Sequence, residues 1–433
     1  MQCTPPRFLS NANVAGNVWV TGNVTTANVN TGNVFTQFLS VTTGFTVNAI
    51  DNTPIGQSIP GLGSFTIMTS KVIQPQYTRP AQRAMLNINL ANAGRKLDPR
   101  IGFARNSIGT YIDYTGNLVV AQPNDVRWHH ETNDVTPRGI MVEESRTNLL
   151  TGSAAFSNPT YWLPIGLTSI TSTTNTKNIT GSLTDAFVIT EDTSTGSHGI
   201  YNTDAQQPTV TLNQNYTATV FVRAGTRTQF SLVFTSPTVT GTTPIFDLTS
   251  GTVYSEGTNY ASSMRAYRDG WYRIHTTVTA AVTGAANVQL LAATGGTVNY
   301  TGSGGVAGYA YGFQVEQGSF HTSYIPTTTV AVTRQQDTVW LNDTNWYDGQ
   351  EGIFFVDGQI GYLPNSKTPN NIRPTFLSME GATPNSDRIV LHAESYSSPS
   401  PIRFANITVY SGGTLQANVG TQDTVNFSNV VNG

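Results

Sequence analysis

The chain of 433 residues contains a single cysteine, Cys3, so it cannot form an intrachain disulfide. Small secreted domains often depend on such bridges, whereas proteins assembled in a reducing bacterial cytosol do without them. The N-terminal residues lack the basic region and apolar run of a signal peptide. No stretch approaches the roughly 18 apolar residues of a transmembrane helix. We therefore expect no membrane insertion and no export by the general secretion route.

Charged side chains are also scarce, since they make up 11% of the residues and the net charge is −3. Globular proteins usually contain about 25% charged residues. Neutral polar groups take their place, with 66 threonines, 37 asparagines and 40 glycines. Threonine favours strands, while asparagine and glycine favour turns, so this composition predicts an all-β protein. With so little positive charge, we expect no nucleic-acid partner.

A short repeat lies near the N-terminus, where Gly-Asn-Val recurs at Gly16–Val18, Gly22–Val24 and Gly32–Val34. Glycine and asparagine accept turn conformations and valine favours strands, so the repeat predicts very short strands between tight turns. Strands of this length cannot bury a core within one chain. Identical chains wound around a common axis would supply the missing neighbours, so the repeat predicts a fibre-like shaft.

Alternating or apolar runs separated by Gly, Pro, Asp and Asn clusters extend from Leu149 to about Asp337. About eight such strands predict an antiparallel double sheet of the jelly-roll type that folds on its own. The clearest predicted strands are Tyr216–Ala224, Gln229–Phe234, Trp271–Ala280 and Asn287–Ala292.

Both flanks of this region are also expected to be rich in strands. Before it, Leu86–Leu90 alternates with period two, which favours a strand over a helix. After it, strands are predicted at Gly352–Val356, Arg388–His392 and Ile402–Tyr410. The sequence supplies no closing strand for this second sandwich, so we expect it to be incomplete or completed by another subunit.

An ordered set of motifs runs through residues 101–148: aromatic-x-Arg-x-Ser, Thr-Tyr, Gly-x-Leu, Arg-aromatic, Arg-Gly and Glu-x-x-x-Thr-Asn-Leu-Leu. This segment resembles one that is common in structural proteins of tailed bacteriophages. The matching positions are Phe103, Arg105, Ser107, Thr110, Tyr111, Gly116, Leu118, Arg127, Trp128, Arg138, Gly139, Glu143, Arg146, Thr147 and Asn148.

Two further stretches extend this resemblance. Residues 53–66, TPIGQSIPGLGSFT, are similar to a motif of tail-fibre shafts. The region after residue 148 resembles the associated carbohydrate-binding-like, or concanavalin-like, β-sandwich. Its matching segments are Phe156–Trp162, Phe221–Thr228, Phe246–Val253, Asp269–Ile274 and Tyr311–Arg334.

The resemblance implies four domains. They are 1–75, a virion-attachment and repeat shaft; 76–148, a β-rich connecting unit; 149–337, the carbohydrate-binding-like sandwich; and 338–433, the second sandwich. It also implies a homotrimeric tail fibre that is assembled in the host cytoplasm and located in the virion. Its expected partners are itself, other tail or baseplate proteins through the N-terminal region, and a host surface glycan or envelope protein.

The sequence offers little for catalysis or metal binding. His129, His130 and Glu131 are consecutive, and consecutive strand residues point to opposite faces, so we interpret them as a solvated turn. The adjacent Glu143 and Glu144 diverge for the same reason, whereas a glycosidase needs two carboxyls roughly 5–10 Å apart across a cleft. We expect Glu143 to form a structural ion pair with Arg138 or Arg146. We predict no catalytic residue, no metal and no cofactor.

Aromatic side chains carry the only recognition signal, since flat rings stack on sugars or pack in cores. We predict ligand contacts for Tyr161, Trp346 and Tyr347. Trp271 and Tyr272 are neighbours in a predicted strand, so one faces inward and the other outward, and we expect Trp271 to be buried.

Two alternatives to a binding tail fibre stay open. One is a tail-spike enzyme that cuts surface polysaccharide, for which Glu316 and Asp348 are the acids to test. The other is a fibre that decorates the capsid, which differs only in where residues 1–15 attach.

Overall fold

The computed structural model describes residues 86–346, except 93, 174–175, 185, 236–241, 342 and 344. It also describes residue 356 and the strands within 375–420. All of these belong to the compact unit Tyr77–Gly433. The predictions for residues 1–75, for the 53–66 motif, for Tyr347 and Asp348, and for nearly all of Gly352–Val356 lie outside the described residues.

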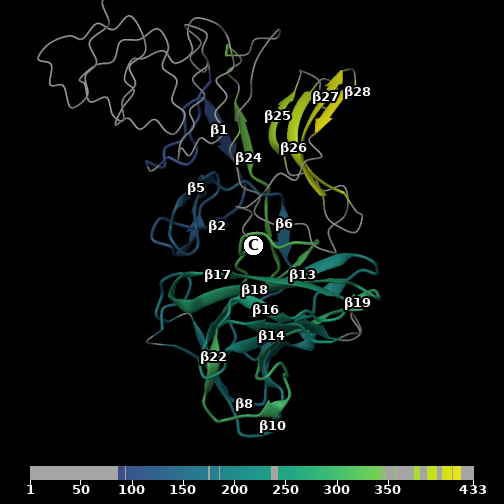
Figure 1. Cartoon of the computed structure of the whole chain (residues 1–433). Helices are drawn as coiled ribbons and strands as arrows, with labels where there is room; N and C mark the ends of the chain where they lie inside the picture. Colours follow the sequence, from purple (N-terminus) through teal and green to yellow (C-terminus); the bar gives the residue numbers. More distant parts are fainter. Residues whose placement is uncertain are drawn as a thin grey trace, which may run out of the picture. The chain divides into compact units, whose positions relative to one another are not determined.

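Two six-stranded antiparallel sheets form the centre of the described chain (Figure 1). The first has the order β16-β15-β14-β20-β11-β7, and the second has the order β17-β18-β13-β22-β9-β8. The first contains β7 (Trp162–Ile165), β11 (His198–Asn202), β14 (Gln229–Thr235), β15 (Ile245–Asp247), β16 (Thr252–Ser255) and β20 (Asn287–Ala293). The second contains β8 (Leu167–Ser172), β9 (Phe187–Glu191), β13 (Asn215–Ala224), β17 (Tyr260–Ala266), β18 (Trp271–Thr279) and β22 (Val306–Gln317).

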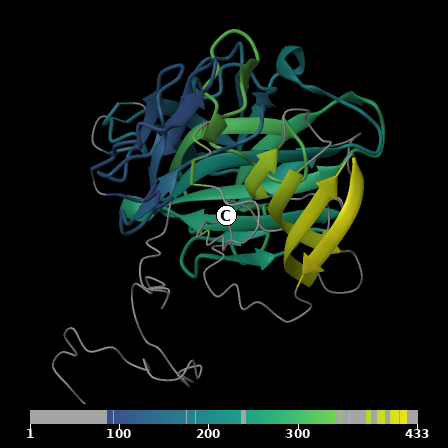
Figure 2. The same ribbon diagram turned by 90° about the horizontal axis from the view of Figure 1, so that it is seen from above.

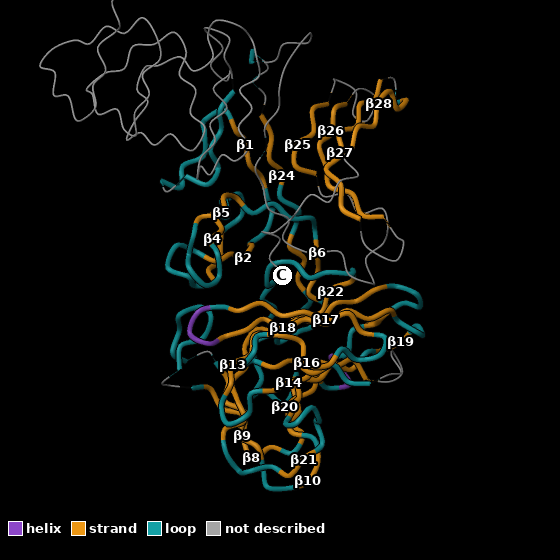
Figure 3. Tube along the Cα trace, in the orientation of Figure 1, coloured by secondary structure: helices purple, strands orange, loops and turns teal. Residues whose placement is uncertain are grey.

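Short elements complete this part of the chain, as the colouring in Figure 3 shows. The only helices among the described residues are two three-residue turns, so none there is long enough to cross a membrane. The short elements are β10 (Thr195–Gly196), η1 (Asp204–Gln206), β12 (Thr209–Val210), η2 (Arg268–Gly270), β19 (Gly284–Ala285) and β21 (Tyr300–Thr301).

The two sheets share one hydrophobic core, and strand alternation explains how. Along β13, Tyr216, Ala218 and Val220 belong to this core, where they join Phe230 of β14 and Leu290 of β20. Successive side chains of a strand point to opposite faces, so the intervening residues of β13 face away from this core. The all-β, antiparallel prediction is therefore confirmed.

A second hydrophobic cluster covers the opposite face of the β13–β18 sheet. Phe221 and Trp271 from that sheet pack with Ile112 and Leu118, which come from the hairpin of β2 (Gly109–Ile112) and β3 (Leu118–Ala121). Trp271 is 1% exposed, and its Nε1 donates to the Lys177 carbonyl at 2.9 Å. The predicted burial of Trp271 is confirmed. Its burial, however, depends on residues that precede the sandwich in the sequence.

Strand pairs join the segment before residue 148 to the segment after residue 331 (Figure 2). β1 (Ile101–Ala104) pairs with β24 (Thr338–Leu341), and β6 (Arg146–Asn148) pairs with β23 (Val332–Arg334). The hairpin of β4 (Trp128–His130) and β5 (Pro137–Ile140) lies between β3 and β6 in the sequence. The unit predicted at 76–148 thus shares one sheet with residues of the domain predicted at 149–337 and another with residues of the domain predicted at 338–433.

A separate four-stranded antiparallel meander follows, with the order β25-β26-β27-β28. It confirms the strands predicted at Arg388–His392 and Ile402–Tyr410. The four clearest strands predicted between 149 and 337 are confirmed as β13, β14, β18 and β20, with ends that agree within one residue. The meander strands are β25 (Thr375–Glu380), β26 (Arg388–Tyr396), β27 (Ile402–Ser411) and β28 (Thr414–Gly420).

The prediction of a strand at Leu86–Leu90 is wrong. Exposure does alternate there, since Leu86, Ile88 and Leu90 are half-buried while the residues between them are exposed. No ladder of hydrogen bonds forms, however, and the first strand of the described chain begins at Ile101. Alternation reports which side chains meet a surface and does not by itself supply a pairing strand.

Candidate functional site

A buried cluster of five charged residues lies where the 101–148 segment meets residues 334–337. Arg105 Nη1 lies 3.0 Å from Asp337 Oδ1, and Arg127 Nη1 lies 2.6 Å from Glu143 Oε2. Arg127 also pairs with Asp337, and Arg334 Nε is 3.5 Å from Glu143 Oε2. Burial alone would raise the pKa of Glu143. The guanidinium groups of Arg127 and Arg334 nevertheless hold this pKa well below its usual range.

This cluster confirms that Glu143 belongs to a structural ion pair but corrects its partners. Arg138 instead pairs with Glu131 at 2.7 Å, and Arg146 pairs with Glu144 at 2.5 Å. Glu143 lies between β5 and β6, and the backbone N–H and hydroxyl of Ser323 both donate to its carboxylate at 2.7 Å, which helps to hold it beside Arg127 and Arg334. Each of the five charged groups has at least one partner of opposite sign, and the three guanidinium groups share the two carboxylates of Asp337 and Glu143.

The interpretation of His129, His130 and Glu131 as a solvated turn is wrong. His129 and His130 form the end of β4, and both His130 and Glu131 are buried. Burial, with a contribution from the Arg265 charge, lowers the pKa of His129 to about 3. Glu131 accepts hydrogen bonds from Arg138 and Arg265. Within the described residues no group of three or more His, Cys, Asp or Glu side chains is arranged to hold a metal ion.

The predicted ligand residues lie on separate elements. Tyr161 directly precedes β7, is half-buried, and packs against the sandwich core with its ring over Gly152. Trp346 follows β24, is half-buried, and donates its Nε1–H to the Asp343 carbonyl. Tyr347 lies outside the described residues. A role for these residues in ligand binding stays a prediction.

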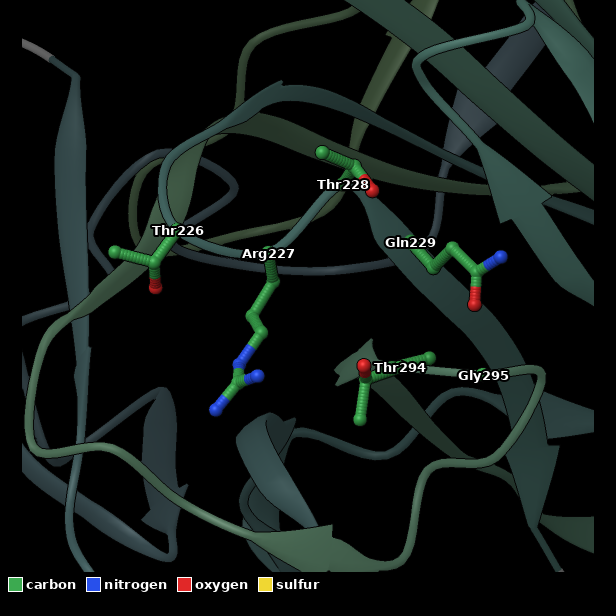
Figure 4. Close-up of a pocket in the computed structure, with 7 residues that line it drawn as sticks. Thr226, Arg227, Thr228, Gln229, Thr294 and Gly295 are labelled. Carbon is green, nitrogen blue, oxygen red and sulfur yellow. The ribbon is translucent and has the colours of Figure 1, made fainter.

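A pocket of about 150 Å³ opens between the β13–β14 loop and the end of β20 (Figure 4). The loop is fixed to the start of β22, because the N–H groups of Thr226 and Arg227 donate to the carbonyls of Val306 and Ala307 at 2.8 and 3.0 Å. The residues that line the pocket are Thr226, Arg227, Thr228, Gln229, Ala293, Thr294 and Gly295.

The other wall of the pocket is a tight turn that needs glycine. Thr294 and Thr297 exchange two backbone hydrogen bonds of 3.0 and 3.1 Å. Between them, Gly295 and Gly296 have φ of +59° and +79°, a conformation that other residues adopt only with strain. The Gly296 N–H donates to Gln229 Oε1 at 2.9 Å, so the turn is also tied to the facing strand.

Behind the pocket, Arg227 is held by a buried carboxylate. Its guanidinium forms a forked ion pair with Glu191, with Nη2–Oε1 at 2.6 Å, and lies 4.5 Å from the centre of the Tyr300 ring. Tyr300 Oη and Ser303 Oγ also donate to Glu191, at 2.8 and 2.6 Å. Burial acts to raise the pKa of Glu191. The hydrogen bonds from Arg227 and Ser303 outweigh burial and lower this pKa to about 2. These contacts fix the Arg227 side chain in place, and the Glu191 carboxylate compensates its positive charge.

An exposed aromatic ring flanks the same turn. Tyr254 of β16 is 57% exposed, and a Cβ atom placed on Gly296 would lie only 2.6 Å from its Cε1. Gln229 joins the turn to Asp247, whose Oδ2 lies 3.5 Å from Gln229 Nε2. Sequence reasoning missed Tyr254, because this residue is not part of an adjacent aromatic pair such as Trp346 and Tyr347. Only the tertiary packing brings it beside the pocket.

Glu316 lies in the protein interior and has a structural role. Glu316, one of the two acids considered for a cleaving enzyme, is completely buried and accepts hydrogen bonds from the Thr322 N–H and hydroxyl at 2.9 and 2.6 Å. Burial raises the pKa of Glu316. In this position the Glu316 carboxyl does not face a surface that a polysaccharide reaches.

The pocket thus offers hydroxyls, an amide and a rigid arginine beside an exposed ring, which is a set of groups suited to binding. Neither a scan against models of protein families nor a search of curated proteins gave a match to this chain.

Proposed function

We propose that this chain is a structural component of a phage virion, a homotrimeric tail fibre that recognises the host cell surface without cutting it. The observation that carries the proposal is spatial. Arg105, Arg127, Glu143 and Arg334 all belong to the motifs that resemble tailed-phage structural proteins, and they converge in one buried charge cluster. These motif residues are far apart in the sequence but meet in one buried cluster. Their convergence supports a resemblance in three-dimensional structure rather than in amino-acid composition.

Asn148, the asparagine of the same motif, supports this argument. It is buried, and its amide donates to the carbonyls of Phe313 and Ile325 at 3.2 and 2.9 Å. Its Oδ1 accepts from the Val315 N–H at 3.1 Å. Asn148 therefore joins the connecting segment to β22 and to the loop that follows it, as expected if the two resembling regions form one module.

Binding without catalysis is proposed from the state of three acids, Glu143, Glu191 and Glu316. Glu143 and Glu191 are each held by arginines, and Glu316 is buried. Hydrolysis of glycans needs two carboxyls across an open cleft. The polar pocket beside Arg227 instead suits recognition.

The proposal includes a jelly-roll sandwich, a trimeric shaft in the repeat region and attachment to the phage tail through the N-terminal region. The fibre is then an adhesin located in the virion. Three weak binding sites on one rigid fibre act at high effective concentration, so avidity gives firm attachment to a host glycan or envelope protein.

The first test is the mass of the full chain by light scattering. The proposal expects about three times the chain mass of 46.6 kDa, and deletion of residues 11–50 is expected to weaken the trimer. A monodisperse monomer would contradict the homotrimer.

The second test separates binding from cutting. Purified protein is incubated with host cells and with their envelope polysaccharide, and both cell binding and release of reducing ends are followed. Saturable binding without release supports the adhesin. Sustained release of sugar ends would instead identify a tail-spike depolymerase.

A further inference from the structure

We propose that the pocket formed by Thr228, Gln229, Thr294 and Gly295, together with the exposed ring of Tyr254, binds one neutral hexose unit of a surface glycan. This inference rests on the proposed function, because it names the site and the ligand class through which the adhesin would act.

The size of the pocket limits the ligand. Its volume is about 150 Å³, below the roughly 300–1,000 Å³ of pockets that enclose drug-sized molecules. A pocket of this volume takes a single sugar ring, while the rest of a glycan chain continues over the open surface. It is therefore suited to the end or to one unit of a polysaccharide.

Hydroxyl groups and an amide supply the hydrogen bonds. Within the part of the chain that the structure describes, the hydroxyls of Thr228 and Thr294 have no hydrogen-bond partner of their own, and both side chains border the pocket in Figure 4. The Gln229 amide already binds Gly296 through its oxygen, which fixes its orientation before a ligand arrives. Such neutral donors and acceptors match sugar hydroxyls.

The charges around the pocket favour a neutral ligand over an acidic one. Among the residues that line the pocket Arg227 is the cation, and its charge is compensated by the fully buried Glu191 at 2.6 Å. Asp247 adds a carboxylate next to Gln229, at 3.5 Å. An anionic sugar would thus meet a balanced arginine and one repelling carboxylate, whereas a neutral hexose meets no unfavourable charge.

Tyr254 completes the site as a stacking surface. Its ring is 57% exposed and lies against Gly296, the residue that follows the pocket wall at Gly295. Exposed tyrosine rings provide a flat apolar face with a polar edge, which suits the C–H face of a pyranose. The turn beneath the ring is fixed by two backbone hydrogen bonds, so the platform is organised before binding.

The test compares binding of neutral and acidic sugars to the full chain. Oligosaccharides of glucose, galactose and mannose, and matched uronic-acid oligosaccharides, are titrated by saturation-transfer NMR and calorimetry. We expect binding of at least one neutral series and at least tenfold weaker binding of its uronic-acid counterpart. Equal or tighter binding of the acidic series would overturn the assignment of a neutral ligand.

Variants locate the site. Tyr254→Ala and Thr294→Val are each expected to weaken binding of the neutral series at least tenfold, while Tyr114→Ala leaves it unchanged. Tyr114 is a matched control because it is 56% exposed and belongs to the β2–β3 hairpin. Unchanged thermal midpoints verify that the variants fold. Wild-type affinity in both pocket variants would overturn the site.

Cell binding distinguishes the failure of this inference from the failure of the proposed function. If the wild type binds host cells and Tyr254→Ala binds them equally well, the pocket is not the receptor site although the adhesin proposal stands. If the neutral sugar binds at the pocket but no host-cell binding occurs, the site stands and the adhesin proposal fails.

Discussion

Arg105 and Asp337 are 232 positions apart in the sequence, yet their side chains form a fully buried ion pair with Nη1 3.0 Å from Oδ1. The same carboxylate also pairs with Arg127 and Arg334. Three guanidinium groups therefore depend on Asp337 and Glu143 for compensation. Burial of a charge without a partner is costly in free energy. The cluster therefore fixes the segment that contains Arg105, Arg127 and Glu143 against residues 334–337.

Asp337→Asn is expected to destabilise the protein by about 3–5 kcal/mol, because it leaves Arg105 and much of Arg127 buried without a counter-charge. Urea unfolding followed by tryptophan fluorescence measures the change. The control is Asp98→Asn, which removes the exposed pair between Asp98 and Arg100 and is expected to leave the unfolding midpoint unchanged. Equal midpoints for both variants would show that the buried cluster does not contribute to stability.

Residues 149–337 alone are expected to be less stable than residues 86–346, contrary to the sequence-based expectation of an autonomous sandwich. The shorter fragment lacks Ile112 and Leu118, which cover Trp271 and Phe221, and it lacks Arg105 and Arg127. Both fragments are compared by urea midpoint and by binding of a dye specific for exposed apolar surface. The same midpoint and no dye binding would support the autonomous sandwich.

Trp271→Ala is expected to cost about 3–5 kcal/mol, as is usual for truncation of a fully buried tryptophan. The indole is 1% exposed and also loses its hydrogen bond to Lys177. Trp340→Ala serves as the control, because Trp340 is 41% exposed and a smaller cost is expected. A change below about 1 kcal/mol at Trp271 would indicate an accessible ring and reopen it as a sugar platform.

Acidification is expected to destabilise the protein in part through Glu131. Burial acts to raise the pKa of Glu131. Pairing with Arg265 and Arg138 outweighs burial and lowers this pKa to about 2 from an ordinary value of 4.5. A carboxyl whose pKa is lower in the folded state contributes stability that is present above about pH 4.5 and is lost as the pH falls towards 2. The free energy of unfolding should therefore fall across this window.

Glu131→Gln is expected to flatten this pH dependence, as measured by urea unfolding at several pH values between 5 and 2. Glu144→Gln is the matched control, because the Glu144 side chain is 55% exposed and its removal is expected to leave the slope unchanged. An unchanged slope in Glu131→Gln would show that its ion pairs do not distinguish the folded from the unfolded state.

The sequence by itself determined the all-β class and the positions of the main strands. Alternation and turn residues located β13, β14, β18 and β20 within one residue at each end, because both signals depend on neighbouring residues. Burial of Trp271 followed from the same alternation. These properties are encoded locally, through the two-residue period of a strand and the conformational preferences of glycine and asparagine.

Only the tertiary structure decided which charges pair and where a pocket forms. Glu143 has Arg138 and Arg146 nearby in the sequence, but it binds Arg127 and Arg334, which the fold brings to it. Likewise, the pattern of His129 and His130 predicts a polar turn, yet both lie in β4, where His129 is half-buried and His130 is buried. The pocket joins Gln229 and Thr294 with Tyr254 beside them, and this arrangement depends on the pairing of β14 with β15 and β20, and of β15 with β16. Such contacts are set by long-range strand order and by the need to compensate buried charge, neither of which is visible in local sequence.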